Sequence, residues 1–154
     1  MKIGIISDTH GYFDPRIPRL FEDVEHIIHG GDVGTLSVTA QLQQIAPVTA
    51  VTGNVDKDIA SLKETELVEL DGRKFLVHHI VDPRDLHKEM RLRIQKEKPD
   101  VVVFGHTHKR FCQIMRGVLF FNPGYAGQQR FDLDRSVAIL KWDEHGVRPE
   151  FLTL

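Results

Sequence analysis

Apolar residues recur along this chain in short β-branched runs, and polar segments that often contain glycine separate the runs. Runs of this kind are typical of buried strands, whereas longer segments with apolar residues three or four positions apart are typical of helices. The pattern predicts helices over Pro15–Glu22, Leu36–Ile45 and Pro83–Lys96. It predicts strands over Lys2–Ile6, His26–Ile28, Val48–Val51, Glu66–Leu70, Lys74–Val77, Val101–Phe104, Phe111–Met115, Val118–Phe121, Ser136–Trp142 and Arg148–Leu152.

The order of these elements predicts the fold class. Strands and helices alternate through the first half, which is typical of a parallel sheet with right-handed crossovers. The second half is rich in hairpin signals, at Asp71-Gly72, Arg116-Gly117 and Glu144-His145-Gly146, which indicate antiparallel strands. An α/β fold with two stacked mixed β-sheets flanked by helices accommodates both halves. The length of 154 residues predicts that residues 1–154 form a single domain.

Composition excludes several classes of protein. The net charge is −2, so no basic field indicates a nucleic-acid or membrane partner. Apolar runs such as Val101–Phe104 are far shorter than the roughly 20 residues of a membrane helix. Met1-Lys2 leads directly into a predicted strand, so we expect no signal peptide. The single cysteine, Cys112, excludes an internal disulfide framework and a thiolate-rich metal site, and a cytoplasmic location is expected.

Polar side chains follow five of the predicted strands, at the point where each strand ends. In an open α/β sheet, ligands bind outside the carboxyl ends of the strands. We therefore expect these side chains to lie together at one rim of the molecule. They are Asp8, His10, Asp32, Asn54, His78, His106 and His108.

This set of two carboxylates, one amide and four imidazoles predicts a metal site. Each motif alone has a simpler explanation, because Gly-Asp and Gly-Asn are common in turns and Asp8 could cap a helix. The occurrence of all five motifs, each at a strand end, favours metal binding instead. Nitrogen and oxygen ligands without sulfur suit two borderline divalent ions, with manganese expected and iron, zinc, cobalt or nickel as alternatives. His29 could support the site from behind.

The ordered motifs resemble those of the calcineurin-like metallophosphoesterases. The family pattern is Asp-x-His, Gly-Asp, Gly-Asn, a His, and Gly-His-x-His, and all five parts occur between Lys2 and about Gly124. The opening Ile5-Ile6-Ser7-Asp8-Thr9-His10-Gly11, the segment Asn122-Pro123-Gly124 and the short length are most similar to the small bacterial and archaeal phosphodiesterases of the YfcE/MJ0936-like group.

The resemblance implies a four-layer αββα sandwich and a dimetal-dependent phosphoesterase, in particular a phosphodiesterase, in which a metal-bridging hydroxide attacks phosphorus. It implies that one metal is held by Asp8, His10, Asp32 and His108. It implies that the other is held by Asp32, Asn54, His78 and His106. Asp32, Asn54 and His106 would also stabilise charge around the hydroxide during catalysis.

Two departures from the family pattern bear on this expectation. Many larger members carry a His directly after Gly-Asn as general acid, whereas this chain has Val55 followed by Asp56. The fourth motif, usually His-Gly-His, reads His78-His79-Ile80. Because His78 follows Val77 at the position of the first His, we favour His78 as the ligand. His79 then stands in place of the glycine, where it could donate a proton to the leaving group.

A non-catalytic interaction scaffold is the alternative to an enzyme. The retromer subunit built on this fold resembles these enzymes but has a degraded metal site, whereas all seven ligand positions hold competent side chains here. The expected partner is therefore a small phosphoester substrate, with no nucleic-acid patch and no membrane. Small family members also form dimers or tetramers, and a homo-oligomer is an open expectation.

Overall fold

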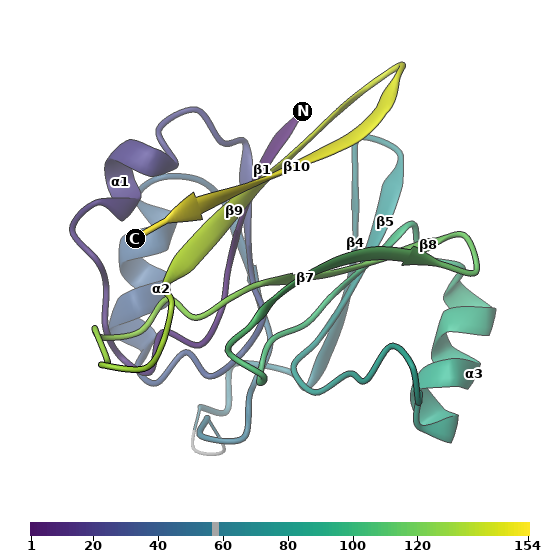
Figure 1. The fold of residues 1–154 in the computed structure, drawn as a ribbon, viewed down its shortest axis with the longest axis horizontal. Coiled ribbons are helices and arrows are strands. Elements are labelled where there is room, and N and C mark those ends of the chain that lie inside the picture. The colour runs from purple at the N-terminus through teal and green to yellow at the C-terminus, as the bar shows by residue number, and fades with distance from the viewer. Residues whose placement is uncertain (57–58) are drawn as a thin grey trace.

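The computed structural model describes residues 1–56 and 59–154, which form two five-stranded mixed sheets and three helices (Figure 1). The first sheet has the order β10-β9-β1-β2-β3, and the second has the order β4-β5-β6-β8-β7. The helices are α1 (Ile17–Leu20), α2 (Leu36–Gln43) and α3 (Lys88–Glu97). The strands are β1 (Lys2–Ile6), β2 (His26–His29), β3 (Val48–Ala50), β4 (Thr65–Leu70), β5 (Arg73–His78), β6 (Val101–Val103), β7 (Arg110–Met115), β8 (Val118–Pro123), β9 (Ser136–Asp143) and β10 (Gly146–Thr153).

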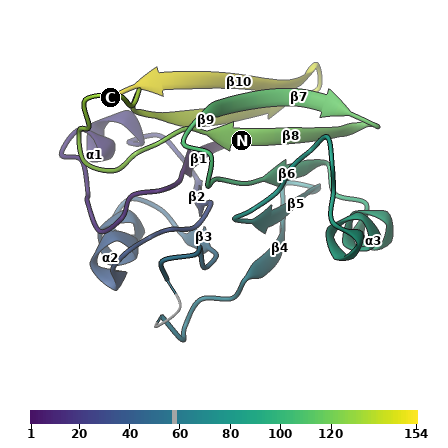
Figure 2. The same ribbon diagram turned by 60° about the horizontal axis from the view of Figure 1, so that its bottom comes forward.

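Three apolar clusters divide the molecule into four layers. Between the sheets, Ile3 and Ile5 of β1 pack with residues of the other sheet such as Val103 and Phe121. On the outer face of the first sheet, a second cluster joins β1 and β2 to α1 and α2, and a third joins β5, β6 and β8 to α3. Figures 1 and 2 show α1 and α2 on one side of the sheets and α3 on the other. The expected αββα sandwich is confirmed.

Each sheet contacts an apolar layer on both of its faces, because successive side chains along a strand point to opposite faces. In β1, Ile3 and Ile5 face the other sheet, whereas Ile6 faces the helices. Gly4 also lies on the helical face, and a Cβ atom there would come within 2.9 Å of the Phe21 ring. The absence of a side chain at this position therefore lets the ring that follows α1 lie directly on the sheet.

The predicted strands all occur, with ends shifted by at most two residues, but the third helix differs. It begins at Lys88 rather than at Pro83. The Asp82 carboxylate accepts a hydrogen bond from the Arg84 N–H at 3.0 Å, and the Asp82 carbonyl accepts one from the Asp85 N–H at 3.1 Å. These bonds close a turn that satisfies the local backbone, so the helix starts later.

No helix within residues 1–56 and 59–154 is long and apolar enough to cross a membrane.

Candidate metal centre

The five predicted strand ends belong to two adjacent sets of parallel strands. β1, β2 and β3 are neighbours in the first sheet, and β5 and β6 are neighbours in the second. Beyond β1 and β2, backbone pairing continues into the loops: the Asp8 N–H donates to the Gly31 carbonyl at 3.0 Å, and the His10 N–H donates to the Asp32 carbonyl at 2.9 Å. A hydrogen bond links the loops of the two sheets: the His106 N–H, after β6, donates to the Asp8 carboxylate, after β1, at 3.1 Å. The loops therefore converge.

The backbone in these loops is unusual. Within the described part of the chain, eight non-glycine residues have a positive φ, and five of them are expected ligands. The five are Asp8, His10, Asp32, His106 and His108, with φ between 48° and 73°. Side chains other than glycine visit this left-handed region at a cost, and such strain accumulates at functional sites. These five residues all lie in the loops that converge at the strand ends.

Buried carboxylates and imidazole nitrogens face one another at this point. His108 Nε2 lies 3.3 Å from Asp8 Oδ1, and His10 Nε2 lies 3.6 Å from Asp32 Oδ2 and 3.9 Å from Asp8 Oδ1. Asp8 is fully buried, yet its Oδ1 has no hydrogen-bond partner, and neither does the buried Nε2 of His10. Leaving buried polar atoms unpaired is costly, so these atoms fit a cation. Suitable ligand atoms come together in the sets Asp8–His10–His108 and Asp8–Asp32–His79.

The structure turns His79, and not His78, toward the carboxylates. His79 Nε2 lies 3.3 Å from Asp32 Oδ2, whereas the His78 ring bonds through Nδ1 to Thr65 Oγ1 at 2.8 Å. Contrary to the preference for His78 from the sequence, the geometry favours His79 as the candidate ligand. Adjacent residues at a strand end point to opposite sides, and His78 still belongs to β5, where it pairs with Thr65 of β4.

A backbone contact fixes the tautomer of His79. Its Nδ1 lies 2.7 Å from the Gly30 carbonyl, which can only accept, so Nδ1 carries the proton. The lone pair of a neutral His79 is then on Nε2 and faces Asp32. Metal-binding histidines commonly donate their other N–H to a carbonyl in this way. The arrangement suits a ligand rather than the proton donor considered from the sequence. Glycine at position 31 is required beside the ring, since a Cβ would lie 2.6 Å from Nδ1.

Asn54 and His106 extend the cluster. The Asn54 Oδ1 lies 3.1 Å from His79 Nε2 and 3.3 Å from His106 Nδ1. Turned over, the amide nitrogen would instead donate to both oxygens of Asp32, at 3.1 and 3.2 Å. In either orientation the Asn54 amide lies between Asp32, His79 and His106. Asp32 Oδ2 lies between the rings of His10 and His79, 3.6 Å from the Nε2 atom of one and 3.3 Å from that of the other.

Two glycines leave room for the carboxylates. A Cβ atom on Gly53 would lie 2.1 Å from Asp32 Oδ1, and one on Gly105 would lie 2.5 Å from Asp8 Oδ2. Any larger residue would displace the carboxylate beside it. This close approach gives a physical reason for the Gly-Asn and Gly-His motifs.

Asp56 organises the loop after β3, a role that the sequence did not predict. Its buried carboxylate accepts hydrogen bonds from the N–H groups of Val33, Gly34 and Gly53 at 2.8–2.9 Å. The neighbouring Val55 N–H donates to Asp32 Oδ1 at 3.0 Å, while its side chain is half exposed. The position that carries a general acid in many relatives thus supports Asp32 through its backbone. An acidic residue two positions after Gly-Asn was the signal available in the sequence.

His29 lies directly behind the loops and has no exposed surface. Its Nδ1 accepts a hydrogen bond from the Gly31 N–H at 3.1 Å, and its Nε2 donates to Thr9 Oγ1 at 2.9 Å. Thr9 in turn donates to the Val33 carbonyl at 2.9 Å. Burial lowers the pKa of His29 to about 4, so the ring is neutral. This supports the hypothesis that His29 positions the site from behind.

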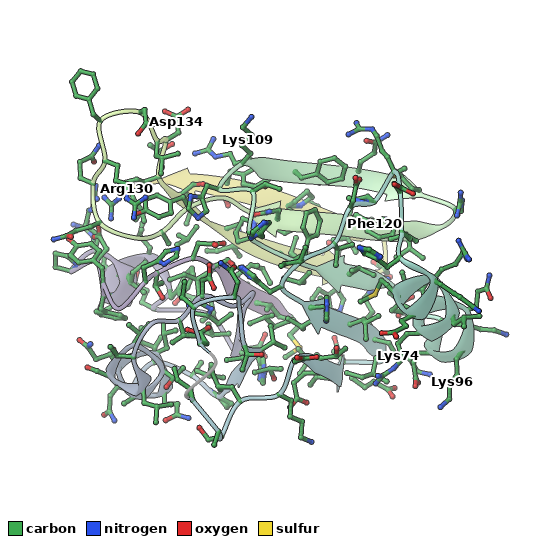
Figure 3. All side chains as sticks on the ribbon, turned by 90° about the horizontal axis from the view of Figure 1, so that it is seen from below. Lys74, Lys96, Lys109, Phe120, Arg130 and Asp134 are labelled. Atoms are coloured by element: carbon green, nitrogen blue, oxygen red, sulfur yellow. The ribbon has the colours of Figure 1, made fainter. Side chains whose placement is uncertain are left out.

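A second side of the site is formed by the loop that follows β8. The fully buried Tyr125 ring lies 4.7 Å from the His108 ring and 6.2 Å from the His10 ring, measured between centroids. The Arg130 guanidinium lies 5.5 Å from the Tyr125 ring centre. Figure 3 labels Arg130 and Asp134 on this loop, far from Lys96 of α3. The loop therefore packs an aromatic ring against two expected ligands.

The electrostatics of Asp32 and His79 reflect their contact. Burial alone would raise the pKa of Asp32, but hydrogen bonds from a protonated His79 ring and from the Val55 N–H outweigh it and lower the pKa. Burial alone would lower the pKa of His79, but the hydrogen bond with Asp32 and the charge of Asp8 raise it. The site thus stabilises positive charge next to its carboxylates.

Comparison with known proteins agrees with this geometry. Residues 1–145 match the calcineurin-like phosphoesterase superfamily domain. A protein of Methanothermobacter thermautotrophicus named "Probable metallophosphoesterase" is 31% identical, over 99% of this chain and 92% of its own. "Phosphodiesterase MJ0936" of Methanocaldococcus jannaschii is 34% identical, over 80% of this chain and 83% of its own. Zn²⁺-complexed Vps29 of Entamoeba histolytica shares the fold, with a TM-score of 0.76 and 21% identity over 99% of each chain. The chain therefore belongs to the calcineurin-like phosphoesterase superfamily.

Proposed function

We propose that this protein is a phosphodiesterase that uses two divalent metal ions. The observation that carries the proposal is the pair of unpartnered buried atoms, Asp8 Oδ1 and His10 Nε2, which lie among carboxylate and imidazole atoms close enough to share a metal ion. A purely structural cluster would satisfy such atoms with hydrogen bonds. Manganese is the proposed metal, with iron, zinc, cobalt or nickel as alternatives that suit the same ligands.

The residues divide into two ligand sets that share one carboxylate. Asp8, His10, Asp32 and His108 would hold one ion, and Asp32, Asn54, His79 and His106 the other. When bound, two such ions lower the pKa of water to near neutrality and neutralise charge on phosphate oxygens. Asp32 sets the spacing between the two sets, and the Val55 N–H keeps its Oδ1 in place.

The remaining groups orient the proposed ligands or stabilise charge on the substrate. The Gly30 carbonyl holds the His79 proton on Nδ1, so that Nε2 stays available. Exposed His106 and the Asn54 amide stand at the open side of the cluster, where they can stabilise charge that develops on a phosphate. No imidazole takes the place of Val55, so protonation of the leaving group would fall to water.

Metal analysis and a chromogenic phosphodiester assay with added manganese test the proposal. We expect two metal equivalents per chain and hydrolysis that excess EDTA abolishes. Stoichiometric metal without turnover of phosphodiesters, phosphomonoesters or cyclic nucleotides would instead favour the interaction scaffold. Full activity in EDTA at equilibrium would contradict the metal mechanism.

A further inference from the structure

A cavity of about 450 Å³ opens directly beside the metal centre, on the side of the second ligand set. Gly53, Asn54 and His79 form its inner wall. Its volume lies within the range of small-molecule sites, about 300–1,000 Å³. A phosphate held by the ligands would therefore have this cavity within reach of one of its ester substituents.

The rest of the lining is mainly aliphatic. Ile59, Ala60, Leu62 and Ile80 contribute apolar surface, and Ile80 remains 48% exposed. Half-exposed isoleucine beside a polar catalytic cluster leaves apolar area that a ligand can cover. Once His79 is placed as the ligand, Ile80 takes the glycine position of the usual His-Gly-His motif. The apolar wall thus arises where the sequence departs from the family pattern.

His78 is one of the residues that line the same cavity. Its ring lines the space together with Thr52 and Glu64, while its Nδ1 is held by Thr65 Oγ1 at 2.8 Å. These three polar side chains can exchange hydrogen bonds with groups at the edge of a ring. The cavity therefore combines aliphatic walls with a few polar groups, as sites for small ligands commonly do.

We propose that this cavity binds a flat ring attached to the phosphoester, so that the enzyme selects substrates with an aryl or nucleobase substituent over those with a small alkyl group. The inference rests on the proposed function, because it places the phosphate at the metal centre. Burying a ring against Leu62 and Ile80 favours binding through the apolar area removed from water.

Competition by two phosphonates, which resist hydrolysis, tests the cavity apart from the chemistry. In the manganese-loaded protein, we expect phenylphosphonate to bind at least about tenfold more tightly than methylphosphonate, since a buried ring contributes more than 1.4 kcal/mol. Ile80→Asn should reduce this ratio to nearly one. The matched control is Ile114→Asn, because Ile114 is 71% exposed on β7, outside the cavity, and the ratio should remain unchanged.

A binding readout and a second ligand complete the test. Methyl resonances of Ile80 and Leu62 should shift with phenylphosphonate and not with methylphosphonate. Adenosine 5′-phosphorothioate distinguishes the source of the ring: tighter binding than phenylphosphonate indicates a nucleobase, and weaker binding an aryl group. Equal affinity for both phosphonates, in a protein that hydrolyses phosphodiesters, would overturn the ring site alone. Absence of both phosphonate binding and hydrolysis would overturn the proposed function.

Discussion

Residues with a positive φ occur both at the hairpin tips of this molecule and at the candidate metal centre, and have a different role in each. At the hairpin tips, Asp71 and Gly72 have φ of 50° and 78°, and Arg116 and Gly117 have φ of 54° and 80°. Positive φ at both central residues defines the type I′ turn, which matches the twist of two antiparallel strands. The strain at the tips therefore serves local chain reversal.

At the candidate metal centre the same backbone conformation occurs in the loops that bring the candidate ligands together. Asp32 has a φ of 54°, almost equal to that of Asp71, yet it is buried among other ligands while Asp71 is exposed. A Cβ on Gly72 would meet nothing within 4 Å, whereas one on Gly105 would lie 2.2 Å from Ser7 Oγ. The comparison teaches that a left-handed residue or a glycine indicates a functional site only when its surroundings are crowded with polar groups.

The largest difference between the two regions is expected for their aspartates. Asp32→Ala should lower phosphodiesterase activity by more than about 10³-fold and remove one or both metals, because Asp32 faces both ligand sets. Asp71→Ala, at nearly the same φ, should leave turnover and metal content unchanged. Steady-state kinetics and metal analysis of both variants measure this. Two metal equivalents and near-normal turnover in Asp32→Ala would refute the bridging assignment.

A pair of glycine substitutions sharpens the comparison. Gly105→Ala should destabilise the fold by about 1–3 kcal/mol through overpacking against Asp8 and Ser7. It should also weaken metal binding by about 10–100-fold, because Asp8 is displaced. Gly72→Ala should cost only about 1 kcal/mol, from its positive φ, and keep full metal affinity. Urea unfolding and metal titration separate the two effects, and equal metal affinities in both variants would contradict the argument.

Acid should lower the free energy of unfolding, because His29 is buried as a neutral ring behind the candidate metal centre. In the unfolded chain His29 has a pKa near 6.5, and burial lowers its folded pKa to about 4, so the unfolded state takes up the proton first as pH falls. Stability that is fully present above pH 6.5 is then lost progressively down to pH 4, by roughly 3 kcal/mol in all.

Urea unfolding in EDTA across this pH range provides the measurement. His29→Gln should flatten the loss of stability between pH 6.5 and 4. His145→Gln, at the exposed β9–β10 tip, should leave the pH profile as it is in the wild type. A variant at His29 with an unchanged profile would show that other groups cause the acid sensitivity.

The smallest expected effect concerns Val55. Without an acid there, the enzyme should favour phosphodiesters with acidic leaving groups such as aryl esters over alkyl ones. Val55→His should narrow this gap by up to about 10²-fold for poor leaving groups, if the ring reaches the substrate. A plot of log kcat/KM against leaving-group pKa measures the slope, with Ile114→His on β7 as control. A shallow wild-type slope that Val55→His leaves unchanged would mean that another group already acts as the acid.

Local rules in the sequence were sufficient for most of the elements. Short β-branched apolar runs predicted the strands of both sheets, because each strand contacts an apolar layer on one or both of its faces. Asp71-Gly72 and Arg116-Gly117 predicted their hairpins, because few residue pairs tolerate two positive φ angles. The candidate site was predictable because the carboxyl ends of neighbouring parallel strands lie at one edge, so motifs that follow them must approach one another.

Tertiary structure decided which way particular side chains point and which backbone groups they bond, neither of which follows from their place in the sequence. Whether His78 or His79 faces the carboxylates depends on the register of β5 against β4 and on the Gly30 carbonyl that holds the His79 ring. Asp56 is important because three N–H groups from two loops meet at its carboxylate. The start of α3 depends on a turn at Asp82. Each of these outcomes requires atoms that are distant in the chain or compete for the same backbone groups, and such competition is resolved only when the whole molecule packs.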